Sequence, residues 1–150
     1  MKATFGAGCF WHVEDLLSKT KGVKSTQVGY IGGNLPNPTY EEVCTDRTGH
    51  AEAVEVEYDP NEITYEELLD VFWNNHNPTT LNRQGPDVGI QYRSAIFYHD
   101  DKQKEIAEKS KSNLDSSGKF PNPIVTEITP APTFYKAEEY HQKYFKKNGF

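Results

Sequence analysis

The segment at residues 50–58 constrains the fold more than any other part of this sequence. Its side chains alternate with the period of a β-strand that has one covered face. The alternation places His50, Glu52 and Val54 on one face and Glu55 on the other. Short strands and helices also alternate along the rest of the chain, with long loops between them. This pattern predicts an α+β fold, a two-layer sandwich with helices packed against a mixed sheet, and fits a doubly wound parallel sheet less well.

The remaining elements follow from apolar periodicity and capping residues. Further strands are expected at residues 2–5, 23–30, 93–98 and 124–128. Helices are expected after Cys9, after the capping residues Thr39, Thr64 and Asp100, and at residues 135–145. The Pro-, Gly- and Asn-rich stretch at residues 74–91 is aperiodic, which indicates a functional loop. No linker or repeat divides the chain, so we expect one domain over residues 1–150.

The charge balance argues against nucleic acid and anionic membranes as partners. The formal net charge is −6, which leaves no basic excess to neutralise phosphates. The first residues lack the pattern of a secretory signal, and no stretch approaches a membrane-spanning length. We therefore expect a soluble cytoplasmic protein.

The two cysteines, Cys9 and Cys44, are too few for a secreted disulfide framework and lack the spacing of a zinc site. Cys9 follows the sequence Gly6-Ala7-Gly8 at the expected start of a helix. Amide groups and the helix dipole at such a position lower a thiol pKa and favour the nucleophilic thiolate. The alternative is a small buried apolar residue. The five histidines show no metal-ligand spacing, so no metal site is expected.

Glu52 lies on the apolar face of the strand at residues 50–58. A desolvated carboxyl group there would have a raised pKa and could donate a proton near neutral pH. The alternatives are a carboxylate paired with Arg47 or Arg93, or a strand end that reaches solvent. The strand alone leaves both interpretations open.

Several other side chains lie close to the thiol or beside loops. Phe10 and Trp11 could line an apolar pocket next to Cys9, or belong to the core. Hydroxyl groups beside loops can face a ligand, and three tyrosines have such positions: Tyr30, Tyr40 and Tyr92. Asp87 lies in the long loop, where an aspartate usually forms a turn.

Five motifs follow one another along the chain: Gly8-Cys9-Phe10-Trp11, Gly29-Tyr30-Ile31-Gly32-Gly33, Pro36-Asn37-Pro38-Thr39-Tyr40, Gly49-His50-Ala51-Glu52-Ala53-Val54 and Gln91-Tyr92-Arg93-Ser94. In order and spacing they resemble the A-type peptide methionine sulfoxide reductases, from about Phe5 to Tyr144. The resemblance implies an oxidoreductase that reduces methionine-S-sulfoxide, free or in proteins, to methionine. Reduction through a thiolate leaves a sulfenic acid that other thiols can reverse.

The resemblance also implies a role for each site residue. Cys9 corresponds to the nucleophile that attacks the sulfoxide sulfur, and Glu52 to the acid. The remaining catalytic positions are Tyr40 and Tyr92, which bond the sulfoxide oxygen, and Asp87, which helps to position those groups. The substrate-binding positions are Phe10 and Trp11, which hold the methyl group, and Tyr30.

The chain departs from the family pattern at two places. His12 stands where glycine is usual, either as an exposed bystander or as an imidazole near the thiolate. The sequence ends at Phe150 without further cysteines, so it resembles the one-cysteine type, some members of which carry selenocysteine at the nucleophile position.

Regeneration is expected to depend on an external thiol, with no bound cofactor. Glutathione with glutaredoxin, or a small dithiol, should support turnover better than thioredoxin alone. Cys44 is expected to be buried and structural, and a resolving role is the alternative.

Two other functions stay open: a cysteine hydrolase that pairs Cys9 with His50 or His141, and a non-enzymatic thiol redox sensor.

Overall fold

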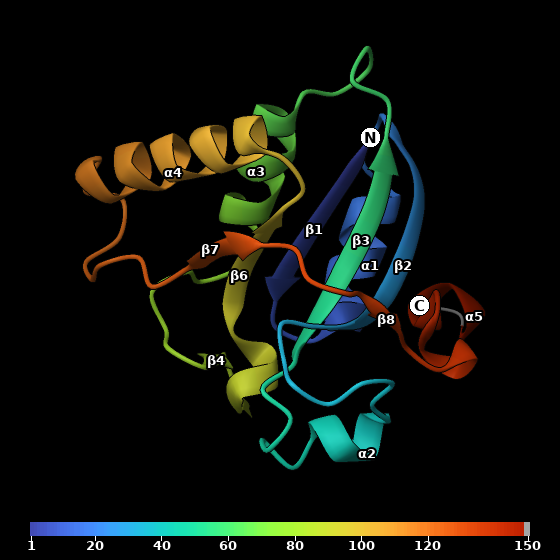
Figure 1. Cartoon of the computed structure of the whole chain (residues 1–150). Helices are drawn as coiled ribbons and strands as arrows, with labels where there is room; N and C mark the ends of the chain where they lie inside the picture. The colour runs from blue at the N-terminus through green and yellow to red at the C-terminus, as the bar shows by residue number, and fades with distance from the viewer. Residues whose placement is uncertain (149–150) are drawn as a thin grey trace.

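The computed structural model describes residues 1–148 as a mixed sheet with helices packed mainly on one of its faces (Figure 1). The strands are β1 (Lys2–Ala7), β2 (Val23–Ile31), β3 (Ala51–Tyr58), β4 (Arg83–Gln84), β5 (Asp87–Val88), β6 (Ser94–Tyr98), β7 (Glu127–Pro130) and β8 (Tyr135–Lys136). The α-helices are α1 (Phe10–Ser18), α2 (Tyr40–Val43), α3 (Tyr65–Asn74), α4 (Asp101–Ser116) and α5 (Tyr144–Lys147), with 3-10 turns at Ile90–Tyr92 and Glu139–His141.

Six strands form the main sheet in the order β7-β6-β1-β3-β2-β8. Strands β6 and β7 run parallel, and the other neighbouring pairs are antiparallel. The predicted α+β architecture with a mixed sheet is therefore confirmed. Strand β3 lies between β1 and β2, and its register places Glu52 directly opposite Tyr30 of β2.

Both faces of the sheet are covered. Helices α1 and α3 pack over one face, where the core includes Phe5, Val54 and Leu68. The connection between β7 and β8 crosses the other face (Figure 1), where Phe134 packs on a smaller apolar cluster that contains Phe97. Burial of a large apolar side chain contributes roughly 1.5–3 kcal/mol, so these two clusters supply much of the driving force for folding.

Three expected helix starts are confirmed by their caps. Thr39 and Thr64 each form a complete capping box, with Glu42 and Glu67 respectively. The Asp100 side chain accepts a 2.7 Å hydrogen bond from the amide of Gln103 at the start of α4. Local sequence therefore fixes where these helices begin.

The long loop at residues 74–91 is held in place by its own side chains. It contains the short hairpin β4–β5. The Gln84 side chain accepts from the Asn77 amide and donates to the Asn77 carbonyl, both at 2.8 Å. These bonds give the loop a defined conformation beside the start of α1.

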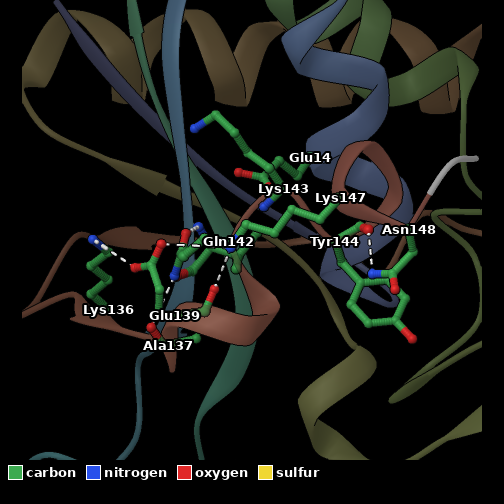
Figure 2. Close-up of polar contacts among 10 residues, drawn as sticks. Glu14, Lys136, Ala137, Glu139, Gln142, Lys143, Tyr144, Lys147 and Asn148 are labelled. Atoms are coloured by element: carbon green, nitrogen blue, oxygen red, sulfur yellow. Dashed lines mark hydrogen bonds and ion pairs between the residues drawn. The ribbon is translucent and has the colours of Figure 1, made fainter.

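The prediction of a continuous helix at residues 135–145 is wrong. Residues 135–136 form β8, and the segment then makes a 3-10 turn and the short helix α5. The Ala137 amide donates to the Val28 carbonyl, and the Gln142 side chain bonds the carbonyl of Ala137 (Figure 2). Lys143 has a left-handed backbone (φ 53°), and its amide donates to the Glu14 carboxylate. Pairing with β2 and α1 thus overrides the local helical pattern.

The strand expected at residues 124–128 is shifted. Strand β7 starts at Glu127, where its parallel ladder with β6 begins. The Val125 amide instead donates to the carbonyl of Pro78 at 2.8 Å, which draws this part of the chain away from the sheet.

Within residues 1–148, no helix combines the length and apolarity needed to cross a bilayer.

Candidate active site

Cys9 is the N-cap residue of α1, directly after β1. Gly8 makes the turn with φ +95°, and a Cβ at this position would lie 2.9 Å from the side chain of Gln84. Glycine therefore allows both the turn and the close approach of the long loop. The expected position of the thiol at a helix N-terminus is confirmed.

The expected lowering of the thiol pKa is not found. The pKa of Cys9 is raised to about 11, chiefly by burial and also by the charges of ionised Glu52 and Asp87. The amides of Trp11 and His12 act in the expected direction, but desolvation outweighs them. The resting site therefore holds a protonated thiol. His12 itself is exposed, which agrees with the first of its two predicted roles, that of an exposed bystander.

Glu52 is almost completely buried, with 1% of its surface exposed. Its Oε1 atom accepts a 3.3 Å hydrogen bond from the amide of Phe10, and its Oε2 atom has no partner among the described residues. Burial raises the pKa of Glu52 to about 8, although the Phe10 amide acts to lower it. The alternative of a pair with Arg93 is wrong, because Arg93 bonds Glu127 at 3.2 Å. Glu52 thus holds a proton at neutral pH.

Tyr40 and Tyr92 lie together near this acid, and both are half-buried. Burial raises the pKa of Tyr92 to about 12, with a further contribution from Glu52, and Tyr92 also interacts with the Tyr40 hydroxyl. Burial likewise raises the pKa of Tyr40, with further contributions from Cys44, Tyr92 and Glu52. Both hydroxyl groups therefore remain protonated and can act as donors.

The expectation that Cys44 is buried is wrong. Cys44 is an exposed free cysteine that follows α2, and Val43 is the buried residue of that helix. The Cys44 thiol interacts with the Tyr40 hydroxyl. The second thiol therefore lies at the border of the candidate site.

Asp87 comes from the hairpin of the long loop and is half-buried. Its charge contributes to the raised pKa of three groups: Cys9, Glu52 and Tyr92. The five predicted catalytic residues therefore lie close enough to influence one another's pKa values: Cys9, Tyr40, Glu52, Asp87 and Tyr92.

The aromatic residues form a second cluster beside the thiol. Phe10 and Tyr30 are buried, with ring centroids 5.8 Å apart, and the Tyr30 hydroxyl donates to Glu138. Trp11 is half-buried and stacks on Tyr144 at a centroid distance of 3.7 Å. Trp11 is therefore the member of the predicted substrate-binding set that retains accessible surface.

Glu138 is a site neighbour that the sequence analysis did not name, and His141 was considered there only as a hydrolase partner of Cys9. The His141 Nδ1 atom accepts a 3.0 Å hydrogen bond from the indole of Trp11, and its ring packs 4.7 Å from that of Tyr40. The local sequence could not indicate the contacts of His141 with Trp11 and Tyr40, because these residues are far apart in the chain.

Among the described residues, no histidine ring bonds Cys9. Both ring nitrogens of His50 bond backbone groups, Gly33 and Leu35, whereas His141 bonds Trp11 through Nδ1 and its Nε2 atom has no partner. The described residues also contain no cluster of His, Cys, Asp and Glu suited to a metal ion.

Comparison with known proteins gives consistent results. Residues 1–150 match the family described as peptide methionine sulfoxide reductase. The chain is 65% identical over 147 residues to the peptide methionine sulfoxide reductase MsrA of Methanothermobacter thermautotrophicus, which covers 98% of this chain and 87% of the relative.

Solved structures show the same fold. Mxr1 from Saccharomyces cerevisiae in its reduced form superposes with a TM-score of 0.92 at 39% identity, covering 99% of this chain and 86% of Mxr1. Mxr1 in complex with Trx2 gives a TM-score of 0.68 at 28% identity, covering 96% and 84%.

Proposed function

The chain belongs to the peptide methionine sulfoxide reductase family and is an MsrA oxidoreductase that reduces methionine sulfoxide, and from this premise we propose how its residues perform the reaction. The substrate is the S epimer of methionine sulfoxide, free or in oxidised proteins. Cys9 is the nucleophile, Glu52 is the proton donor, and the Tyr40 and Tyr92 hydroxyls bond the sulfoxide oxygen. Asp87 helps to position these groups.

The reductive step transfers one oxygen atom. The Cys9 sulfur attacks the sulfoxide sulfur while Glu52 protonates the oxygen, which makes the sulfur electrophilic. This attack forms a bond between the two sulfur atoms. The sulfur–oxygen bond of the substrate then breaks as the oxygen moves to the Cys9 sulfur, and the sulfur–sulfur bond breaks. Methionine leaves, its sulfur reduced by two electrons, and Cys9 becomes a sulfenic acid. The proton lost by the thiol restores the proton on Glu52.

The observation that carries this proposal is the buried carboxyl of Glu52, which accepts a hydrogen bond from the amide of Phe10 beside the half-buried thiol of Cys9. With its proton in place, Glu52 adds no negative charge to the site, so one of the causes that raise the pKa of Cys9 is removed. The thiolate then forms more easily at the moment when the acid is ready to donate. The proton on Glu52 thus favours the thiolate form of Cys9, and these are the two protonation states that the reaction needs.

The aromatic cluster supplies the binding surface for the substrate methyl group. Trp11 presents accessible indole surface, and its N–H is occupied by His141. Phe10 and Tyr30 are buried in the core and pack against each other.

An external thiol regenerates the enzyme. A first thiol displaces water from the Cys9 sulfenic acid and forms a mixed disulfide, and a second thiol then releases Cys9. Glutaredoxin with glutathione and thioredoxin both supply this chemistry, and the complex of Mxr1 with Trx2 supports the thioredoxin class. The exposed position of Cys44 supports a second route, in which a Cys9–Cys44 disulfide forms first.

The two other candidate functions have weaker support. A cysteine hydrolase needs a histidine bonded to the thiol, but among the described residues no histidine ring bonds Cys9, and both ring nitrogens of His50 bond backbone groups. A redox sensor needs no acid beside the thiol, whereas Glu52 is held there with a proton.

The test is a single turnover without reductant. Prereduced protein is mixed with the S or the R epimer of methionine sulfoxide, and released methionine is counted per chain. We expect stoichiometric release from the S epimer and none from the R epimer. Oxidation of Cys9 by peroxide without release of methionine from either epimer would instead identify a sensor.

A further inference from the structure

Glu138 lies at the start of the last 3-10 turn, and each of its oxygen atoms accepts a hydrogen bond from a different element. Oε1 accepts from the Tyr30 hydroxyl on β2 at 2.9 Å. Oε2 accepts from the backbone amide of Tyr40 at the start of α2 at 3.0 Å. The carboxylate therefore joins the sheet to the helix that carries a proposed catalytic hydroxyl.

Helix α2 depends on contacts of this kind. It has four residues, which is far too short for a helix to be stable by itself. Thr39 caps the amide of Glu42, and Glu138 takes the amide of Tyr40 from 98 positions away in the sequence. Glu138 thus completes the N-terminal cap of the turn that presents Tyr40.

The second contact of Glu138, with the Tyr30 hydroxyl, connects it to the strand position opposite Glu52. Tyr30 is fully buried and lies directly opposite Glu52 in the ladder between β2 and β3. A displacement of Tyr30 would therefore affect Glu52, its partner on the neighbouring strand. One carboxylate spans the gap between the strand position that faces the acid and the first residue of α2.

We infer that Glu138 is a positioning residue, which holds the Tyr40 hydroxyl at a fixed place relative to Glu52 through its bonds to the Tyr40 amide and to Tyr30. This inference rests on the proposed function, because it assigns Tyr40 and Glu52 to the reductive step. Glu138 itself does not touch the substrate.

The charge state of Glu138 suits this role. Burial by itself would raise the pKa of Glu138, but hydrogen bonds from the Tyr40 amide, its own amide and Tyr30, together with His141, hold it below its ordinary value. An ionised carboxylate accepts on both oxygens, so both contacts persist at neutral pH.

Hydrogen exchange tests the structural half of the inference without any catalytic readout. The amides of Val43 and Cys44 bond back to Thr39 and Tyr40, both at 3.0 Å, and report the opening of α2. In Glu138→Ala we expect these amides to exchange faster, while amides of β3 keep their parent rates. The matched control is Glu139→Ala, which removes the same charge from the adjacent, exposed residue and should leave α2 unchanged.

Single-turnover kinetics test the functional half. Displacement of a reacting group can cost ~100-fold in rate, so we expect Glu138→Ala to slow methionine release by ~10- to 100-fold, with Glu139→Ala close to the parent. Glu138→Gln should recover part of the rate, because its amide oxygen can still accept from Tyr40. If Glu138→Ala fails to fold, as judged by circular dichroism, Glu138→Gln carries the test.

A double-mutant cycle with Tyr40→Phe distinguishes positioning from general destabilisation. If Glu138 acts through the Tyr40 hydroxyl, its removal should have little further effect once that hydroxyl is gone. Rate losses that simply multiply, or parent exchange at Val43 together with a parent rate in Glu138→Ala, would overturn the inference. A parent protein that releases no methionine would overturn the proposed function instead, and the exchange experiment would still decide the role of Glu138.

Discussion

The amide of Phe10 donates a 3.3 Å hydrogen bond to Oε1 of Glu52, which ties the first turn of α1 to β3. Because Cys9 immediately precedes Phe10, this contact also fixes the thiol relative to the acid. Oε2 of Glu52 has no protein partner in the described structure. We expect this second oxygen to carry the proton that is transferred to the substrate.

Replacement of Cys9 by serine should abolish methionine release. A hydroxyl at the N-cap of α1 is sterically mild, so the fold should persist, but it is far less nucleophilic than a thiolate. Methionine is counted by chromatography after a single turnover, with circular dichroism as the control for folding. Appreciable turnover by Cys9→Ser would show that the nucleophile lies elsewhere.

Replacement of Glu52 by glutamine should slow the reductive step by roughly 10²- to 10⁴-fold, the usual contribution of a general acid. The amide keeps the shape and can accept from the Phe10 amide, but it cannot give a proton to the sulfoxide. Substrate affinity should change less than the single-turnover rate, and the deficit should shrink at low pH, where solvent protonates the sulfoxide. A parent rate at neutral pH would make Glu52 structural.

The pH dependence of the reductive step should break near pH 8. The reactive state needs Cys9 as thiolate and Glu52 with its proton. Below about pH 8 Glu52 is protonated and the thiolate fraction grows with pH, so the rate should rise. Above it, loss of the Glu52 proton cancels the gain in thiolate, and the rate should level off. A rate that keeps rising steeply through pH 9 would contradict this pairing.

Glu52→Gln should also lower the pKa of Cys9. Glu52 is one of the charges that raise this pKa, although burial is the larger cause and remains in the variant. Alkylation by iodoacetamide as a function of pH measures the thiol, in a Cys44→Ser background so that one cysteine reacts. An unchanged alkylation profile would mean that the two groups do not share one electrostatic site.

Cys44→Ser should retain the capacity for turnover with glutathione and glutaredoxin if an external thiol attacks the sulfenic acid directly. Mass spectrometry after one turnover, with a sulfenic-acid trap present, should then show the adduct on Cys9. A quantitative Cys9–Cys44 disulfide in the parent, lost together with turnover in Cys44→Ser, would establish the internal route. Turnover with thioredoxin is measured in parallel to rank the two reductants.

Features set by short-range patterns could be predicted from the sequence. The alternation at residues 50–58 located β3 and placed Glu52 on its apolar face, although whether that end of the strand reached solvent stayed open. The two capping boxes located the starts of α2 and α3. Residues 135–145 could not be predicted in this way, since their local helical pattern competes with bonds to β2 and to Glu14 that only the folded chain provides.

The electrostatics of the site depended on distant residues. The helix amides do lower the pKa of Cys9, but the sequence could not weigh them against burial and against the Asp87 charge, which arrives from the long loop. Glu138 and Glu139 look alike in the sequence as two adjacent acids. Tertiary structure alone separates the one that bonds Tyr30 and Tyr40 from the one that faces solvent.

The Gln142 side chain has a consequence for how the chain behaves at high concentration. Its amide accepts from the Val28 amide and donates to the Val28 carbonyl, both at 2.9 Å, as a paired strand would. Strand β8 pairs with β2 at Gly29 and Tyr30, so Val28 is the next rung of the ladder at this border. Without this side chain the Val28 carbonyl would keep the Ala137 amide, but the Val28 amide would have no partner, and an unpaired strand amide is a site where another strand can add. Gln142 closes it, and loss of its side chain would therefore show first as self-association of the protein on storage or heating.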